Sequence, residues 1–487
     1  MMPGAMTPPV RTLADIAPLA PELVVVMGAF ALLMLDLFIG ERRRVVTHAL
    51  AVAVLVAATA MIAAGVGGQG EVLAGMFVRD TAADVLKIGI LAFTAISLGY
   101  AWPFMRERDL YKGELPVLVL FAAVGMMLLV SAPNLATVYV GLELLALCQY
   151  ALVAIDRDNP VGSEAAMKYF VLGSLASGLL LFGMSLVYGA TGSLDLSTIA
   201  GAAATVDGGT RTLLLPGTVF LVVGVCFKFG AAPFHMWLPD AYHGAPTPIT
   251  IFIGSAPKLA VFGMAYRLLE AGVGPLQDQW QLMVALLAAL SLVVGNVFAL
   301  AQSNLKRMLA YSTVSHVGFL LLGLAGGGPE GYAAAMFYAF SYAIMATAGF
   351  GAIVLLARRG FEADRIEDFK GLNARSPWMA AMVLVVMASL AGVPPFLGFW
   401  AKLVVLRAAI GGDMLWLAIV GIVFAVVGAF YYLRVIKVMY FDEPTGAPIQ
   451  VSDNGPLRAL FAVNAAALLV LGLAWNPIMA WCQAAFA

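Results

Sequence analysis

Residues 222–248 read VVGVCFKFGAAPFHMWLPDAYHGAPTP, an apolar helix that carries a lysine and is then interrupted by prolines. Lys228 comes shortly before the first of them, Pro233. Proline removes a backbone donor and breaks a helix, and in lipid a broken backbone survives only where protein or a wet cavity covers it. A second long apolar run, 377–411, is interrupted at Pro394–Pro395. Two proline-interrupted spans in one chain indicate a transport site.

Composition indicates that lipid is the solvent of this chain. Hydrophobic residues make up 62% of the 487 and charged residues 11%, with a mean hydropathy of +0.95, whereas soluble domains carry about 25% charged residues. A formal net charge of -1 gives no electrostatic footprint for nucleic acid. The three cysteines lie far apart, and the sequence has no dinucleotide fingerprint or P-loop. We therefore expect no cofactor and no metal in this chain.

Apolar runs of about 20 residues, long enough to cross a bilayer, predict an all-α polytopic membrane protein. We count fourteen such runs. They are 22–40, 46–66, 83–104, 114–132, 134–155, 163–190, 211–243, 248–270, 278–302, 306–326, 330–357, 377–411, 413–440 and 456–479. The seventh and the twelfth are the runs that proline breaks.

Lysine and arginine are divided unequally between the two sides of the predicted bundle. Of the 27, we sort 17 to one side and 4 to the other, which places the larger set in the cytoplasm and both termini outside. Because the broken spans are an odd number of helices apart, two consecutive five-helix units would form an inverted repeat. The expected divisions are flanking helices at 1–110, a first repeat at 111–272, a second, inverted repeat at 273–445, and a C-terminal helix at 446–487.

Four ionisable residues lie deep in the predicted spans: Glu143, Lys228, Lys258 and Lys402. A charge at mid-membrane costs roughly 2.5–3.5 kcal/mol on insertion scales, so each needs a partner or a function. A row of such groups at similar depth favours a proton relay. The alternatives are a structural role for Glu143, as a carboxylate satisfied by a lysine, and a Lys228 that reaches a membrane interface.

Further candidates are two histidines and one charged pair. His235 lies just beyond the first break and His316 lies in the middle of a span, and each is either a relay group or a hydrogen-bonded core histidine. Glu164 and Lys168 are spaced to share one helix face, as part of the relay or as an ordinary ion pair near a helix end. All four therefore stay candidates.

Other charges are assigned structural roles. Lys87 and Arg267 lie nearer the ends of their spans, which favours side chains that reach the interface or support packing. The loop 358–375 mixes both signs of charge and is interpreted as a solvated cytoplasmic surface loop. We expect none of these residues in the relay.

Five motifs carry a resemblance to a known family. They are GLELLALCQYALVA around Glu143, EAAMKYFVLGSLASG around Lys168, KFGAAPFHMWLPDAYHGAPTP around Lys228, QSNLKRMLAYSTVSHVGF around His316, and GVPPFLGFWAK ending at Lys402. With them the chain resembles the antiporter-like membrane subunits of respiratory complex I, the proton-translocating NADH:quinone oxidoreductase, and among these the N-type subunits. The resemblance covers essentially the whole chain.

The resemblance implies roles for the buried charges. It makes Glu143 and Lys228 a half-channel pair, Lys258 the connecting lysine and Lys402 the terminal lysine of a second half-channel. A lysine at the terminal position separates the N-type from the M-type subunits, which have glutamate there. L-type subunits are longer and end in an amphipathic helix.

The resemblance also implies a setting. NADH, FMN, iron–sulfur clusters and quinone would be bound by other subunits, with no redox centre in this chain. The neighbours would be K-, M- and J-type subunits and lipids, in a bacterial inner membrane with both termini periplasmic. Because the family includes subunits of multisubunit cation/proton antiporters, that function is the alternative; a purely structural membrane module is the third hypothesis.

Overall fold

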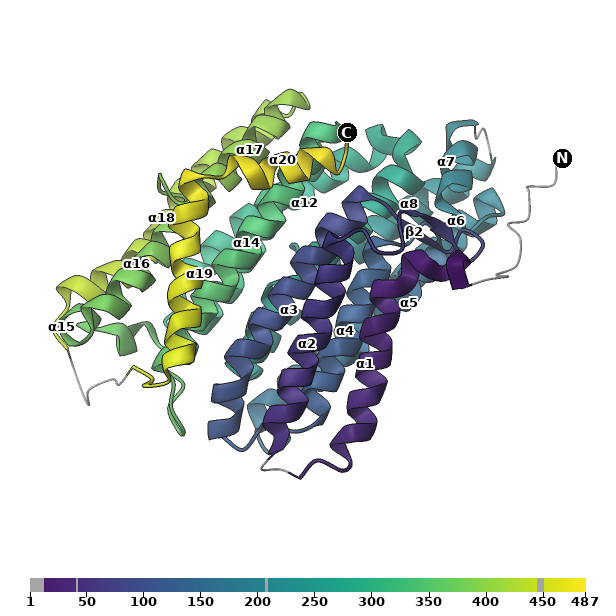
Figure 1. Ribbon diagram of the computed structural model, residues 1–487. Helices are drawn as coiled ribbons and strands as arrows, with labels where there is room; N and C mark the ends of the chain where they lie inside the picture. Colours follow the sequence, from purple (N-terminus) through teal and green to yellow (C-terminus); the bar gives the residue numbers. More distant parts are fainter. Residues whose placement is uncertain (1–12, 41–42, 206–208, 445–450) are drawn as a thin grey trace.

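The computed structural model describes residues 13–40, 43–205, 209–444 and 451–487. Arg42, one of the basic residues sorted to the cytoplasm, lies outside these ranges, as does the expected boundary at residue 445. Figure 1 shows long helices that lie side by side with roughly parallel axes. The chain is a membrane bundle with a single short hairpin among the described residues.

The elements follow the chain in four groups. The N-terminal group is η1 Leu13–Leu19, α1 Ala20–Asp36, α2 Arg44–Ala63, β1 Gly70–Val72, β2 Phe77–Arg79 and α3 Thr81–Glu107. The next group is α4 Glu114–Val130, α5 Leu135–Val153, α6 Pro160–Thr191, α7 Leu196–Thr205, α8 Gly209–Phe229, α9 Trp237–Gly244, α10 Thr247–Gly254, α11 Ala256–Tyr266, η3 Arg267–Gly272 and η4 Gly274–Leu276.

The third group is α12 Gln277–Leu300, α13 Leu305–Gly326, α14 Gly328–Leu356, η5 Ile366–Phe369, α15 Leu372–Arg375, α16 Pro377–Ala391, α17 Leu397–Gly411 and α18 Leu415–Phe441. The chain ends with α19 Gly455–Leu473 and α20 Asn476–Ala484. The hairpin pairs β1 with β2 in antiparallel register, with Glu71 opposite Val78.

The predicted fold class is confirmed. In the described ranges, 12 helical segments are long and apolar enough to cross a membrane. Of the other two predicted spans, 114–132 forms the shorter α4, and 377–411 is divided into α16 and α17 by residues 392–396. The seventh predicted span is likewise divided, into α8 and α9. The predicted breaks in the seventh and twelfth spans are therefore present.

Matching backbone contacts occur at the starts of α5 and α13. Asn134 caps α5, and its segment forms an antiparallel bridge with Asp195. Asn304 caps α13 in the same way and forms an antiparallel bridge with Arg365. Each asparagine side chain accepts hydrogen bonds from helix N–H groups that lack intrahelical partners. The two helix starts therefore share a capping asparagine and an antiparallel bridge.

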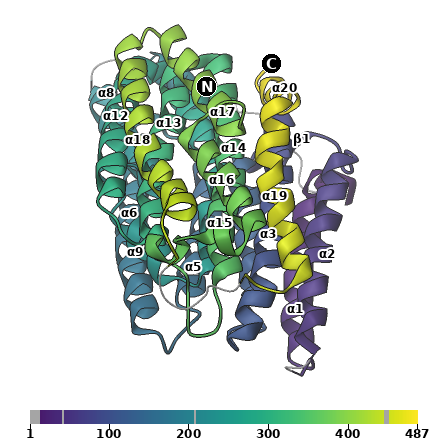
Figure 2. The same cartoon turned by 90° about the vertical axis from the view of Figure 1, so that its left-hand side faces the viewer.

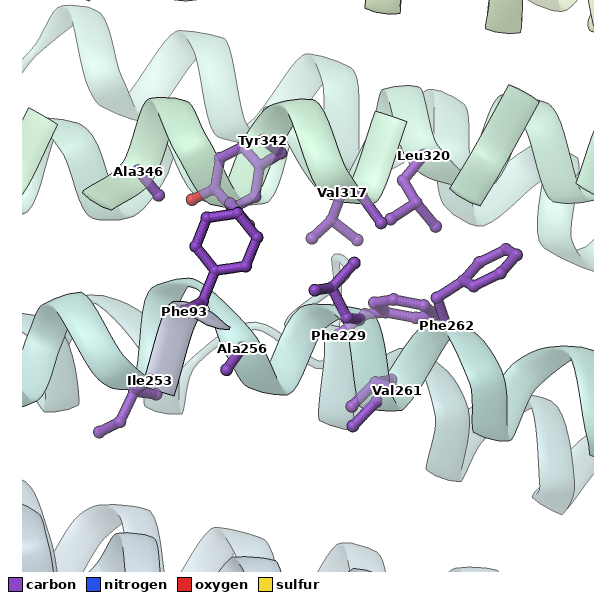
Figure 3. Packing of buried hydrophobic residues seen from close by; sticks show 14 of the residues in the cluster. Phe93, Phe229, Ile253, Ala256, Val261, Phe262, Val317, Leu320, Tyr342 and Ala346 are labelled. Carbon is purple, nitrogen blue, oxygen red and sulfur yellow. The ribbon is translucent and has the colours of Figure 1, made fainter. Parts of the chain in front are cut away.

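The centre of the bundle contains an apolar layer between α13 and the segment formed by α8 and α11 (Figure 3). Figure 3 shows Val317 and Leu320 of α13 on one side of this layer and Phe229 and Phe262, from α8 and α11, on the other. These side chains are at most 2% exposed. In the turned view of Figure 2, α19 stands between the helices of the second repeat and the N-terminal group. Close packing in this layer holds the helices together, because van der Waals contacts between side chains drive helix association in lipid.

Candidate functional site

Lys228 lies in the last turn of α8, directly before the first break. The helix ends because Gly230 takes a left-handed conformation, with φ at 79°, which favours glycine. The Lys228 Nζ atom is buried and has no hydrogen-bond partner among the described residues. Glu143 on α5 lies within electrostatic range of it, and its buried Oε1 atom also lacks a hydrogen-bond partner there. The two side chains interact through space and form no ion pair within 4.0 Å in the described part of the chain.

Lys258 closes the end of the helix that carries Lys228. It lies on α11 and is 2% exposed. Its Nζ atom donates a hydrogen bond of 2.7 Å to the carbonyl oxygen of Phe229, the last residue of α8. Carbonyls at a helix C-terminus have no intrahelical partner and carry partial negative charge, so they are natural acceptors for an ammonium.

A small cavity lies between these two lysines. Its volume is about 10 Å³, and its lining includes Lys228, Lys258, Gln149 and Tyr169. The Tyr169 hydroxyl donates a 2.7 Å hydrogen bond to Gln149 Oε1. A cavity needs about 10–15 Å³ to hold one water molecule, so this mostly apolar space is just large enough for one. One water could therefore connect the two ammonium groups.

Lys402 repeats this contact at the second break. Its Nζ atom donates to the carbonyl oxygens of Leu390 and Ala391, at 3.0 and 2.9 Å, and these two residues end α16. Gly392 follows with φ at 87°, and a Cβ atom there would lie 2.9 Å from Lys402 Cδ. Glycine is required at this position by both the conformation and the approach of the lysine.

His316 lies within electrostatic range of Lys402. Its ring is held between two tyrosines: Nδ1 is 2.7 Å from the Tyr338 hydroxyl, and Nε2 is 3.1 Å from the Tyr432 hydroxyl. It is 3% exposed. Both ring nitrogens therefore have partners able to donate or accept, which is the arrangement a relay histidine needs, although a structural histidine is bonded in the same way.

The remaining candidates lie apart from this buried line. His235, in the segment between α8 and α9, is half-buried, and its Nδ1 atom has no hydrogen-bond partner among the described residues. Glu164 and Lys168 form an exposed ion pair of 2.8 Å on α6. Lys168 also contacts Asp240 on α9 at 3.2 Å, and Arg307 on α13 contacts the same carboxylate at 2.7 Å. This network joins α6, α9 and α13 at one end of the bundle.

Sequence reasoning missed a buried ion pair in the N-terminal group. Lys87 on α3 is fully buried and lies 2.7 Å from the carboxylate of Glu22 on α1. Of the two roles expected for Lys87, a side chain that reaches the interface or one that supports packing, this burial favours the second. Arg267, assigned a structural role, indeed binds the Asp80 carboxylate through two hydrogen bonds of 2.8 and 2.7 Å. The only available signal for the Glu22–Lys87 pair was an acid at the start of the first apolar run.

The loop 358–375 is more than a surface loop. Asp364 accepts a hydrogen bond of 2.6 Å from Asn304 and lies 3.7 Å from His243. The contact with His243 is the main cause that holds the pKa of the Asp364 carboxyl below its usual value. Glu362 contacts Arg108 at 3.2 Å. These acids attach the loop to the ends of α3, α9 and α13.

Comparison with known proteins gives consistent matches. The family model described as NADH:quinone oxidoreductase/Mrp antiporter, transmembrane, matches residues 132–428. The NADH-quinone oxidoreductase subunit N of Xanthomonas euvesicatoria pv. vesicatoria is 68% identical over 98% of this chain and 97% of its own length. The protein of the same name from Thioalkalivibrio sulfidiphilus is 49% identical over 94% of this chain and 96% of its own length.

Solved structures agree with these matches. A chain of respiratory complex I from Thermus thermophilus has a TM-score of 0.80 and 31% identity, covering 94% of this chain and 98% of that one. A chain of the Mrp complex from Dietzia sp. DQ12-45-1b has a TM-score of 0.80 at 23% identity, covering 98% of this chain and 97% of that one. At that identity the second match shows the shared fold alone.

Proposed function

The chain belongs to the NADH:quinone oxidoreductase/Mrp antiporter membrane family, and from this premise we propose that it translocates protons in the membrane arm of a NADH:quinone oxidoreductase. It is an antiporter-like membrane component of that oxidoreductase complex. Electron transfer would take place in other subunits, which would hold FMN, the iron–sulfur clusters and the sites for NADH and quinone. This chain would act as the translocase and contain no redox centre.

The observation that carries the proposal is the placement of Lys258 and Lys402 at the two helix breaks. Each ammonium is buried and bonded to neutral carbonyls at the end of a broken helix. No carboxylate in the described residues lies within ion-pair distance of either Nζ atom. A lysine held only by carbonyl dipoles can exist with or without its proton, whereas a close carboxylate would favour the charged form.

The proposed route runs through the bundle from Glu143 to Lys402. Glu143 sets the electrostatic environment of Lys228, and a water in the cavity of about 10 Å³ passes the proton to Lys258. His316, bonded to two tyrosine hydroxyls, would connect the second half of the route to Lys402. His235, Glu164 and Lys168 would act nearer its ends.

The apolar layer in Figure 3 is the closed part of this route. Val317 of α13 and Phe262 of α11 lie on its two sides. Protons cannot cross such a layer without water, since an unsolvated charge in an apolar medium is very costly. We propose that quinone reduction in other subunits opens this layer to water for part of each cycle.

The setting follows from the same proposal. K-, M- and J-type subunits would be the neighbours, together with lipids, in a bacterial inner membrane with both termini periplasmic. The two repeats would occupy 111–272 and 273–445, between flanking helices at 1–110 and a C-terminal helix at 446–487. The matching contacts at Asn134 and Asn304 support the repeat.

The variant Glu143→Gln tests the function in the assembled complex. We expect NADH-driven proton uptake into vesicles to fall at least about tenfold, because losing the charge beside Lys228 raises the barrier by ~1.4 kcal/mol or more. Glu367→Gln, at a side chain that is 74% exposed, is the matched control and should pump normally. Proton uptake at the wild-type rate by the Glu143→Gln complex would contradict the proposed role of Glu143 in proton translocation.

A cation/proton antiporter subunit is the second candidate, because the matching family also contains Mrp antiporters. Purification separates the two functions. A complex I component co-purifies with flavin and iron–sulfur subunits, and an antiporter subunit does not. Isolation of this chain in an assembly free of flavin would favour the antiporter.

A further inference from the structure

A second cavity, separate from the one between Lys228 and Lys258, opens where α3, α14 and α19 meet. Its volume is about 350 Å³, and its lining includes Trp102, Phe104 and Arg106 of α3, Val354 of α14, and Leu457 of α19. It shares no residue with the cavity between Lys228 and Lys258. A volume of this size is typical of pockets that hold small ligands.

The cavity lies beside a close contact between α3 and α19. The helices approach closely at Gly99, where a Cβ atom would lie 3.0 Å from the Leu460 side chain. The cavity lies beyond this contact, beside the end of α3 and the start of α19. The chain before α19 is fixed there by a 2.9 Å hydrogen bond from Ser452 N to Leu355 O. The opening lies at the end of the bundle that the distribution of lysine and arginine assigns to the cytoplasm.

One guanidinium group in the cavity, that of Arg106, forms no ion pair with a described acid. Arg106 is exposed, its guanidinium lies 5.4 Å from the Trp102 ring, and no carboxylate in the described ranges is within ion-pair distance of it. In contrast, Arg108 contacts Glu362 at 3.2 Å. Glu107, which also lines the cavity, accepts a hydrogen bond from the backbone N–H of Arg359.

The walls resemble a membrane interface. Trp102 packs against His48 and Tyr111, with ring centroids 5.1 and 4.8 Å apart. Aromatic rings of this kind gather at the level of lipid headgroups. Phe104, Val354 and Leu457 form the closed inner wall of the cavity and are at most 4% exposed.

We propose that this cavity binds the headgroup of one anionic phospholipid, with its phosphate on Arg106. Guanidinium groups bind phosphate through two parallel hydrogen bonds, and basic pockets between helices on the cytoplasmic side recognise anionic headgroups. Ser452 and Asn454 line the same opening and supply further polar groups for the headgroup. The bound lipid fills the space between the N-terminal helices and the second repeat.

Photolabelling of the whole complex tests this site. The complex is reconstituted into vesicles that contain a photoactivatable phosphatidylglycerol or, in the second arm, a phosphatidylcholine with the same chains. Adducts on peptides that contain 102–108 and 452–457 are then quantified by mass spectrometry. We expect several-fold more adducts with phosphatidylglycerol. Equal labelling by the two lipids, or no adduct because a neighbouring subunit covers the cavity, would overturn the proposal.

Charge variants show whether Arg106 holds the lipid. Arg106→Gln should lower the phosphatidylglycerol adducts about fivefold, since one arginine near an anionic surface contributes about 1 kcal/mol. Arg359→Gln, whose side chain is 72% exposed and pairs with Asp109, is the matched control and should label normally. If Arg106→Gln fails to assemble, Glu107→Gln gives the complementary test and should increase labelling. Wild-type labelling in both cavity variants would contradict the site.

Discussion

The ammonium of Lys258 donates a 2.7 Å hydrogen bond to the carbonyl oxygen of Phe229, the residue at which α8 ends. Lys402 makes the corresponding contact with Leu390 and Ala391 at the end of α16. Each break in the bundle is therefore completed by a lysine from another helical segment. The fold depends on the same two ammonium groups that the proposed route uses.

Lys258 variants separate these two roles. Lys258→Met leaves the Phe229 carbonyl without its donor and should destabilise the assembled complex by about 1–3 kcal/mol. Lys258→Gln supplies an N–H donor but no releasable proton, so it should recover part of the stability and still pump poorly. Thermal denaturation and proton uptake are measured on both. A glutamine variant that pumps at the wild-type rate would show that Lys258 is purely structural.

Gly392 controls the position of Lys402. Gly392→Ala places a Cβ atom 2.9 Å from Lys402 Cδ in a left-handed residue, a conformation that costs an L-residue about 1–2 kcal/mol. We expect lower stability and slower pumping. Gly411→Ala, on the same helix as Lys402 and with no atom within 4 Å of the added methyl group, is the control. Equal behaviour of the two variants would contradict the proposed contact.

Glu22 and Lys87 form a pair whose members depend on each other. Removing one partner of a buried pair costs about 3–5 kcal/mol, because the other charge is left uncompensated. Lys87→Met alone should therefore impair assembly, and the double variant Glu22→Gln/Lys87→Met should recover most of it. The yield of assembled complex is the measurement. Additive losses in the double variant would mean that the two residues act independently.

Asp364 attaches the loop 358–375 in a pH-dependent way. Its folded pKa is lowered, chiefly by His243, so its contribution is complete above the ordinary carboxyl pKa of about 3.9 and is lost as the pH falls through the lower folded value. At pH 7, Asp364→Asn should make the loop exchange amide hydrogens faster. The difference from wild type should shrink below about pH 4. If the difference in exchange rate between the variant and wild type stays constant with pH, the Asp364 carboxylate does not attach the loop.

Some of this structure could be predicted from the sequence because the signals are local. Prolines mark both breaks directly, and long apolar runs mark the spans, so the bundle and the broken helices were expected. The contacts of Lys258 and Lys402 with carbonyls could not be predicted from the sequence, because they depend on how the helices pack. The pairing of Glu22 with Lys87 was missed for the same reason: α1 and α3 are separated by α2 in the chain. The attachment of Asp364 to Asn304 likewise joins two distant segments.

Lys228 is the residue whose chemistry decides between a relay and a fixed charge. Its Nζ atom is buried without a hydrogen-bond partner in the described residues, and Glu143 is the acid within electrostatic range. Arginine keeps the charge but does not release a proton at working pH. Lys228→Ala should allow assembly and lower coupled turnover, and serves as the reference for full loss of the proton carrier.

The most direct measurement is NADH-driven proton uptake by vesicles that contain the assembled Lys228→Arg complex, with assembly checked separately. If Lys228 must gain and lose a proton in each cycle, uptake falls toward the level of Lys228→Ala although the charge is conserved. If the arginine complex takes up protons at the wild-type rate, Lys228 acts as a fixed charge and the relay is contradicted.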